Sequence, residues 1–215
     1  MQIPARSHQY LSIKSMSNRT VLASLATLAL AFSITGCMGV SLEEKQNEVP
    51  PEKPKITFST TEGDFVIGVL PKNAPNSVEK FISWCKGFET QNGQFVESIY
   101  NGLQFYRVMP GKFVQGGDPF NNGTGSDAFK IPFEKTEKKL KRGTVCLAND
   151  GEGNNNCIFF ILLVDTPQFQ GKYTAVGEVL QGLDVIDRMS NVTTRPDEPN
   201  TPLRNISIIG VKVSE

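Results

Sequence analysis

Arg107 and Gln115 are the two side chains of this sequence whose types and spacing most suggest chemistry. They lie eight residues apart in the stretch from 105 to 118, which reads FYRVMPGKFVQGGD and is followed by Gly123-Thr124-Gly125. An arginine stays charged and carries several N–H donors in a rigid fork, so it can stabilise an electron pair that develops in a transition state. The plain alternative is that Arg107 is a surface charge, Gln115 is a polar strand residue and the glycines make turns.

The histidine content excludes several classes of catalysis. The only histidine, His8, lies in an N-terminal stretch of 36 residues that we expect to be removed. Ser-His-Asp and Cys-His catalysis, and histidine-ligated metal sites, need an imidazole that the rest of the chain lacks. Residues 150–156 (DGEGNNN) offer oxygen ligands, but their order does not fit an EF-hand, and we interpret them as a solvated loop. We therefore expect no metal and no cofactor.

The charge of the chain gives no sign of a nucleic-acid partner. The formal net charge is zero, and the first 36 residues hold three basic side chains and no acid. The rest of the chain therefore has a net charge of −3, which does not provide a polyanion-binding surface. With 215 residues, 39% of them hydrophobic, the chain is expected to form one globular domain.

Three segments in a fixed order give the sequence a family resemblance. The first is the stretch that carries Arg107 and Gln115. The second runs from 147 to 161 and contains LAN and FFI, and the third combines GKYT at 171–174 with VGEV at 176–179. These segments resemble the cyclophilins, whose motifs have the same spacing within the first and second segments. The resemblance covers about residues 55–213.

The resemblance implies a peptidyl-prolyl cis-trans isomerase, expected to be a monomer, that acts on proline-containing polypeptides. Arg107 would donate to the proline nitrogen of a twisted X-Pro bond, and Gln115 would orient the arginine and bind the substrate backbone. Ala148 and Asn149 would pair with the peptide main chain. The proline pocket would be lined by Phe113, Phe160 and Phe169, with Tyr173 at its edge. The alternative is a non-catalytic module that holds proline peptides in the same groove and does not need Arg107.

The sequence departs from the family pattern at five positions. Tyr106 replaces the histidine that usually precedes the arginine, and Lys112 and Phe113 stand where Phe and Met are common. Ile158 replaces a glutamine, and Gln168 falls where eukaryotic members often have tryptophan. Because the arginine and the glutamine are kept, we expect these changes to alter the rim of the pocket and its substrate preference more than catalysis.

The segments around these motifs read as short strands, which must position the site residues. Residues 56–60 and 65–70 predict an opening hairpin, and further strands are expected at 103–108, 113–115, 144–148, 158–164, 174–179 and 206–213. Apolar spacing predicts a helix capped by Asn76 and ending near Gly87, and a second helix is expected at 183–189. The pattern favours a closed antiparallel barrel or a sandwich.

Combined with the resemblance, these elements give the expected fold of residues 55–215. It is mainly β: a closed antiparallel eight-stranded cyclophilin-like barrel capped by two α-helices. Cys85 reads as a buried thiol on the apolar face of the first helix. Cys146 and Cys157 lie on neighbouring predicted strands, where they could form a disulfide or remain two buried thiols. Residues 88–97 (FETQNGQFVE) look like an insertion beside the groove.

The N-terminus reads as an export and lipidation signal. Residues 21–34 (VLASLATLALAFSI) form an apolar run too short to span a bilayer comfortably, and a basic stretch precedes it. The ITGC that ends at Cys37 resembles a bacterial lipobox. We therefore expect residues 1–36 to be a lipoprotein signal peptide, and residues 37–54 to be the lipidated Cys37 and a flexible tether. An uncleaved anchor, or an ordinary signal peptide in which Cys37 is incidental, is the alternative.

The expected location is the cell envelope, where a lipid anchor would hold the domain on the membrane. Met38, and not an aspartate, follows Cys37, which favours the outer membrane facing the periplasm. Met16, followed by SNR, would make a more typical start than Met1.

Overall fold

The computed structural model describes residues 54–214, which belong to one compact unit of the chain. Its first elements, β1 (Lys55–Thr60) and β2 (Gly63–Val69), form the predicted opening hairpin, in which Phe58 lies opposite Phe65. Along β1, buried residues alternate with half-buried ones, because successive side chains of a strand point to opposite faces.

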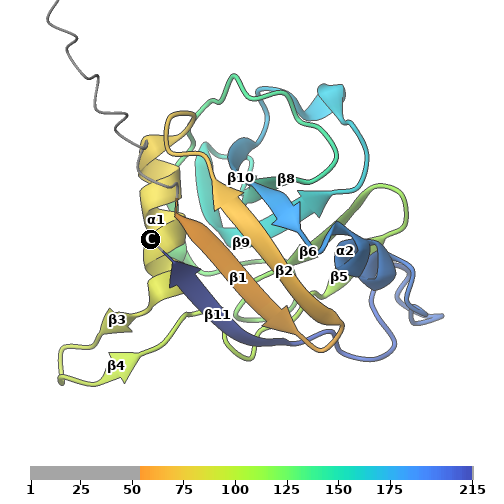
Figure 1. The fold of residues 1–215 in the computed structure, drawn as a ribbon, viewed down its shortest axis with the longest axis horizontal. Helices are drawn as coiled ribbons and strands as arrows, with labels where there is room; N and C mark the ends of the chain where they lie inside the picture. Colours follow the sequence, from red (N-terminus) through yellow and green to blue (C-terminus); the bar gives the residue numbers. More distant parts are fainter. Residues whose placement is uncertain (1–53, 215) are drawn as a thin grey trace, which may run out of the picture. The chain divides into compact units, whose positions relative to one another are not determined.

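The strands within residues 54–214 form an antiparallel nine-stranded sheet and a separate two-stranded hairpin (Figure 1). Neighbours in the large sheet follow the order β11-β1-β2-β10-β8-β9-β6-β5, and β7 pairs with β9. Its other strands are β5 (Arg107–Met109), β6 (Phe113–Gly116), β7 (Ile131–Pro132), β8 (Thr144–Asn149), β9 (Asn154–Leu162), β10 (Thr174–Gln181) and β11 (Ile208–Ser214).

The sheet is curled but open, so the prediction of a closed eight-stranded barrel is wrong. β11 and β5 are the two ends of the path, and an isolated bridge from Gln104 to Ser207 stands between them in place of a ladder. A backbone hydrogen bond of 2.9 Å from Phe105 to Ile206 also crosses this gap. The strand predicted at 103–108 shortens to the three residues of β5, which are too few to pair continuously with β11.

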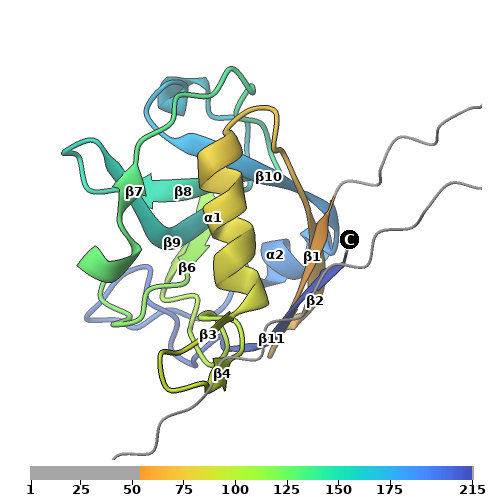
Figure 2. The same ribbon diagram turned by 90° about the vertical axis from the view of Figure 1, so that its left-hand side faces the viewer.

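Within the described residues, two α-helices lie at opposite ends of the curled sheet (Figures 1 and 2). They are α1 (Pro75–Lys86) and α2 (Leu183–Ser190), close to the predicted ranges. The face of α1 that packs inward carries Val78, Phe81 and Cys85, at the spacing expected of an amphipathic helix. Two short 3-10 turns, η1 (Asp127–Phe129) and η2 (Pro167–Phe169), complete the described elements.

The N-terminus of α1 is capped from a distant part of the chain, and the predicted cap by Asn76 is wrong. Ala74 occupies the N-cap position and offers no side-chain acceptor. The Glu134 carboxylate instead accepts hydrogen bonds from the backbone N–H of Ser77 at 2.8 Å and from the side chain of Asn76 at 3.1 Å. The helix begins at Pro75, so Asn76 lies inside the first turn and donates where a cap would accept.

Two hydrophobic clusters divide the side chains of β8 and β9 between them. The larger cluster includes the aromatic residues Phe58, Phe65, Phe81, Tyr100, Phe105 and Phe159. The smaller cluster includes Phe160 and Leu162, with Phe113, Phe169 and Tyr173 packed against it. Because neighbouring residues of a strand point to opposite faces, Phe159 and Phe160 belong to different clusters. The smaller cluster forms the floor under the site described below.

Cys85, Cys146 and Cys157 are buried free thiols. Cys146 belongs to the smaller cluster and Cys157 to the larger one, so their side chains lie on opposite faces of the β8–β9 pair. The alternative of two buried thiols therefore holds, and the disulfide does not. Burial raises the pKa of Cys146 and that of Cys157 to about 12, which keeps both thiols protonated and unreactive.

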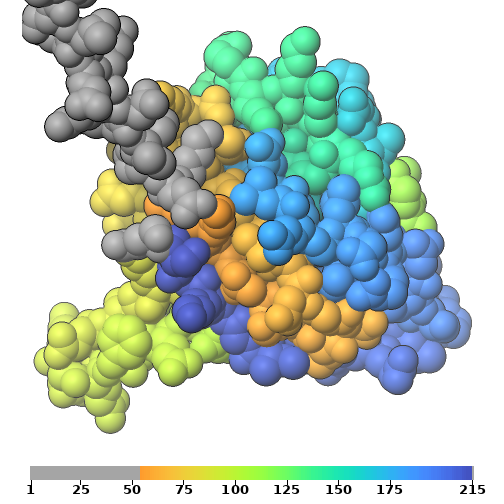
Figure 3. Space-filling model, viewed as in Figure 1, coloured from red at the N-terminus to blue at the C-terminus, as the bar shows by residue number. Residues whose placement is uncertain are grey.

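Residues 88–97 form a hairpin at the C-terminal end of α1. β3 (Phe88–Glu89) and β4 (Phe95–Val96) pair antiparallel. Figure 3 shows this hairpin projecting from the body of the domain, with Phe95 67% exposed. None of its residues is among those that line the cavity that holds the site residues.

Candidate active site

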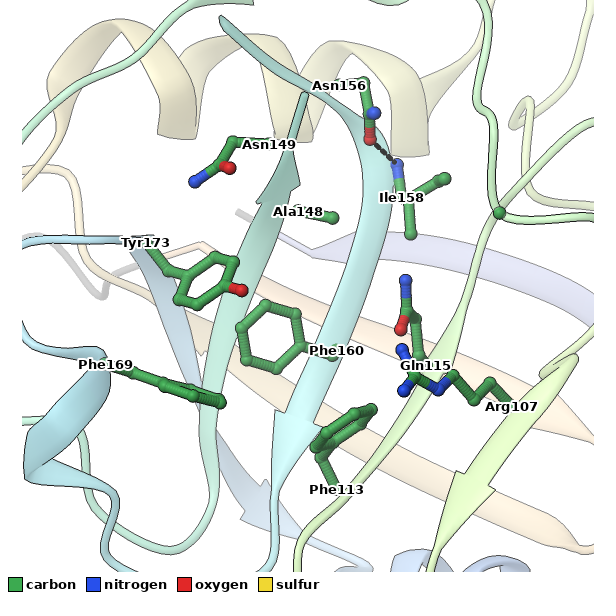
Figure 4. A pocket seen from close by; sticks show the side chains of 11 residues that line it. Arg107, Phe113, Gln115, Ala148, Asn149, Asn156, Ile158, Phe160, Phe169 and Tyr173 are labelled. Carbon is green, nitrogen blue, oxygen red and sulfur yellow. Dashed lines mark hydrogen bonds between the residues drawn. The ribbon is translucent and has the colours of Figure 1, made fainter. Parts of the chain in front are cut away.

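All eight site residues predicted from the sequence line one cavity of about 320 Å³ (Figure 4). They are Arg107, Phe113, Gln115, Ala148, Asn149, Phe160, Phe169 and Tyr173. The structure adds Gly123, Asn156 and Ile158 to the lining. The cavity lies over the smaller hydrophobic cluster, which holds its aromatic residues in place.

Strand pairing brings residues from distant parts of the sequence to this cavity. β5 and β6 pair in a register that places Arg107 directly opposite Gln115. β6 in turn pairs with β9 so that Gln115 lies opposite Phe160. Residues directly opposite on adjacent strands project from the same face, so these three side chains reach one cavity. Ala148 and Asn149 come from the end of β8, beside β9.

Four aromatic rings form the apolar wall of the cavity. The Phe160 ring is 5.7 Å from that of Phe113 and 5.0 Å from that of Tyr173, between centroids. The ring centroids of Phe169 and Tyr173 are also 5.0 Å apart. Tilted and edge-to-face contacts in this distance range are favourable beyond the area they bury. Because Phe160 is buried and the other three are half-buried, the group presents a concave apolar surface that suits a compact ring.

The guanidinium of Arg107 lies over the Phe113 ring, 5.2 Å from its centroid. This cation–π contact holds the charged group at the rim of the apolar wall. Arg107 is an exposed residue overall, yet its guanidinium faces the cavity (Figure 4). The arrangement sets rigid N–H donors beside a surface that excludes water, where a hydrogen bond to a developing lone pair is stronger than in bulk solvent.

Asn149 connects the end of β8 to the loop that carries Tyr173. Its Nδ2 donates a hydrogen bond of 2.5 Å to the Lys172 carbonyl. The register of β8 against β9 shifts between Leu147 and Asn149, so Ala148 lies at an irregularity of the ladder. On its other side β8 pairs with β10 only as far as Leu147, so Ala148 and Asn149 lie beyond that ladder and beside the cavity.

Sequence reasoning missed Gly123, which lies on the loop after β6. The buried Asp118 carboxylate orders this loop by accepting backbone hydrogen bonds from Phe120 at 3.0 Å, Asn122 at 2.9 Å and Gly123 at 2.6 Å. Gly123 has a φ of 87°, a left-handed conformation that favours glycine. The GTG motif signalled a turn, but the sequence held no sign that this turn borders the cavity.

Asn156 was also missed, because residues 150–156 were interpreted as a solvated loop. The last three residues of that stretch belong to β9. The Asn156 Oδ1 accepts a hydrogen bond of 2.9 Å from the Ile158 N–H, which fixes the side chain at the cavity. Among the departures from the family pattern, Ile158 lines the cavity, whereas the exposed Lys112 and Gln168 do not.

The described residues offer neither a clustered metal site nor a helix that could cross a membrane. Within residues 54–214, no three His, Cys, Asp or Glu side chains are grouped so that they could hold a metal ion. In the same part of the chain, no helix has both the length and the apolar character needed to cross a bilayer.

Comparison with known proteins places this site in a family. The family model described as cyclophilin type peptidyl-prolyl cis-trans isomerase/CLD matches residues 55–213. The chain is 34% identical over 169 residues to a peptidyl-prolyl cis-trans isomerase-like 1 protein of Emericella nidulans, covering 74% of this chain and 94% of that protein. It is 33% identical over 137 residues to a peptidyl-prolyl cis-trans isomerase of Helicobacter pylori, covering 62% and 78% of the two chains.

Some relatives are much longer. The mouse peptidylprolyl isomerase domain and WD repeat-containing protein 1 is 33% identical over 183 residues, which is 80% of this chain but 27% of that protein. The chain thus spans about a quarter of the length of this relative.

A solved structure shows the same fold. It is the crystal structure of a Cryptosporidium parvum cyclophilin type peptidyl-prolyl cis-trans isomerase in the presence of the dipeptide Ala-Pro. The TM-score is 0.64 at 23% identity, covering 75% of this chain and 99% of the other. The curled sheet with two helices is therefore cyclophilin-like. Because the family model spans most of the described residues, this chain belongs to the cyclophilin-type peptidyl-prolyl cis-trans isomerase family.

Proposed function

We propose that this chain is a peptidyl-prolyl cis-trans isomerase that accelerates rotation about X-Pro bonds in extended or unfolded polypeptides. The observation that carries the proposal is the Arg107 guanidinium at the rim of an apolar cavity, 5.2 Å above the Phe113 ring. The family membership and the isomerase names of the curated relatives support it.

The chemistry follows from the peptide bond. Rotation about an X-Pro bond breaks amide resonance, which presents a barrier of about 18–20 kcal/mol. Midway through the rotation the proline nitrogen becomes pyramidal and gains a lone pair. An N–H of Arg107 that donates to this lone pair stabilises the twisted state over both planar states. No covalent bond to the protein forms, so the step needs no nucleophile.

The other residues of the cavity would bind the substrate. The aromatic wall around Phe160 accepts the proline ring, and Gln115 is placed to hydrogen-bond the substrate backbone beside Arg107. Ala148 and Asn149 lie beyond the last β8–β10 pair, where their main chain would pair with an extended peptide. The solved relative studied with Ala-Pro supports proline-containing peptides as the substrate class.

The activity can be measured on the purified full chain with a short peptide that contains an Ala-Pro bond. Uncatalysed exchange takes tens of seconds or longer. We expect the relaxation rate to rise in proportion to the concentration of the chain. Peptide binding with no change of this rate would contradict the proposal and favour the non-catalytic binding module.

We further propose that the chain is a lipid-anchored protein of the bacterial envelope that assists the folding of exported proteins as a monomer. The support is the sequence of residues 1–36 with its apolar run, and the lipobox-like ending at Cys37. These residues, and the proposed tether up to residue 53, lie outside the described part of the chain. Lipid attachment at Cys37, with Met38 after it, favours the outer membrane facing the periplasm.

A further inference from the structure

We propose that Tyr106 is a positioning residue of the active site: its hydroxyl holds the Gln115 carboxamide so that the amide oxygen faces Arg107. The inference rests on the proposed isomerase function, because it concerns how the same site is organised. Tyr106 stands where the family usually has histidine, and it is not among the residues that line the cavity.

The contact that carries the inference is short and partly shielded from water. Gln115 Nε2 donates a hydrogen bond of 2.7 Å to the Tyr106 hydroxyl oxygen, and Tyr106 is a half-buried residue. Its ring lies under the loop that borders the cavity, since a Cβ added at Gly123 would be 3.8 Å from the ring and from the hydroxyl. Tyr106 therefore connects this loop to the carboxamide opposite Arg107.

The direction of the carboxamide decides whether it supports Arg107. A glutamine amide has an acceptor end and a donor end, whereas a guanidinium only donates. Figure 4 shows the oxygen of the Gln115 amide turned toward the Arg107 guanidinium and its nitrogen turned away. The nitrogen then needs an acceptor, and the Tyr106 hydroxyl provides one. Without that acceptor, the terminal torsion of Gln115 is broad and the amide can turn its donors toward the guanidinium.

The chemical state of Tyr106 fits this role. Burial, followed by the nearby Asp118 charge, raises the pKa of Tyr106 well above its ordinary value. The hydroxyl therefore stays neutral over the pH range of an ordinary assay. An unperturbed tyrosine titrates near pH 10, and the pKa of Tyr106 is higher still. We therefore expect the effect of Tyr106 on turnover to be independent of pH from about pH 6 to pH 9.

The test removes one oxygen atom from the full chain, with Tyr106→Phe. We expect kcat for an Ala-Pro peptide to fall about three- to tenfold, the size of one lost hydrogen bond, while KM stays within about twofold. In a Gln115→Ala background, Tyr106→Phe should cause no further loss, because the group that it positions is gone. The side-chain NH₂ resonances of Gln115 should also lose their hydrogen-bonded shift in Tyr106→Phe.

Tyr100→Phe is the matched control. It also removes a tyrosine hydroxyl hydrogen bond, 2.9 Å to the Cys157 carbonyl, but in the core and away from the cavity. We expect it to lower stability and leave kcat unchanged. Wild-type turnover in Tyr106→Phe, or an equal loss with and without Gln115, would overturn this inference alone. Absence of turnover in the wild-type chain would overturn the proposed function together with it.

Discussion

At the scale of residues, the proposed acceleration depends on how much one guanidinium can contribute. Raising a rate of about 0.01 per second to about 1000 per second requires lowering the barrier by about 7 kcal/mol. One charged hydrogen bond made mainly in the transition state contributes about 3–4 kcal/mol. Arg107 can therefore supply about half of such an acceleration. We expect the remainder to come from the aromatic wall, which would orient the proline and exclude water.

Ile158, like Phe113, is a departure from the family pattern that lines the cavity. It is 1% exposed in the domain and still borders the cavity beside Asn156 and Gly123. An aliphatic side chain in place of a glutamine makes this part of the lining more apolar. The substrate residue that contacts it is therefore expected to be apolar as well. Lys112, the other departure expected to affect the rim, points to solvent in the turn between β5 and β6.

At the scale of elements, the loop that precedes β8 stabilises α1 from a distance. Glu134 accepts backbone and side-chain hydrogen bonds at the start of this helix. Its own backbone is fixed to β10, because the Thr174 hydroxyl donates to the Glu134 carbonyl at 2.7 Å. Glu134 thus connects α1 to the strands beside the cavity, with its carboxylate on the helix and its backbone carbonyl on β10.

We expect Glu134→Ala to lower the free energy of unfolding by about 1 kcal/mol, as for other lost helix N-caps. Urea unfolding followed by circular dichroism measures this change. Glu137→Ala is the control, since it removes an exposed carboxylate of the same loop. Equal stability of Glu134→Ala and Glu137→Ala would show that the cap contributes nothing.

The same cap makes a prediction for pH. Partial burial acts to raise the pKa of Glu134, but hydrogen bonds from Ser77 and Asn76 outweigh it, and the pKa is lowered. A lowered pKa in the folded state stabilises the fold above the unfolded pKa, about 4.3, and this contribution is lost as the pH falls through the folded value. The stability difference between wild type and Glu134→Ala should therefore shrink on acidification. A difference that stays constant into strong acid would contradict the role of the charge.

The elements also show what local sequence patterns can and cannot predict. Short runs typical of strands, bounded by turn residues, predicted β1, β2, β8 and β10 to within a few residues, because that signal is carried by each strand itself. Closure of the barrel failed as a prediction, since it depends on a continuous ladder between β5 and β11, about a hundred residues apart, where the structure has the isolated Gln104–Ser207 bridge. The cap of α1 failed for the same reason, because Glu134 is 58 residues from Asn76.

The candidate site also contains residues that the sequence predicted and residues that it did not. Arg107 and Gln115 were predicted because their motif resembles that of the cyclophilins, and the structure places them opposite each other on β5 and β6. Gly123 and Asn156 were not found, because each reaches the cavity through hydrogen bonds that order a loop or a strand start. Tyr106 was noted as a departure, and its contact with Gln115 emerged from the structure.

At the scale of the whole molecule, the proposed lipid anchor predicts where the protein is found. Cys37→Ser removes the thiol that would carry the lipid, so we expect loss of fatty-acid labelling and release from the membrane fraction of bacterial cells. Met38→Asp is the matched variant: it should keep the lipid and move the protein from the outer to the inner membrane. Unchanged membrane partitioning of Cys37→Ser, with labelling retained, would contradict lipidation at this residue.

Arg107 is proposed to act on the transition state of proline isomerisation. The most direct measurement compares turnover and proline-peptide affinity of the folded Arg107→Ala chain with those of Lys112→Ala, which removes a nearby charge that does not line the cavity. We expect Arg107→Ala to lower turnover about a hundred- to thousandfold. Peptide affinity should change far less, because the aromatic wall remains, and Lys112→Ala should resemble wild type. Turnover of Arg107→Ala near the wild-type rate would contradict the account.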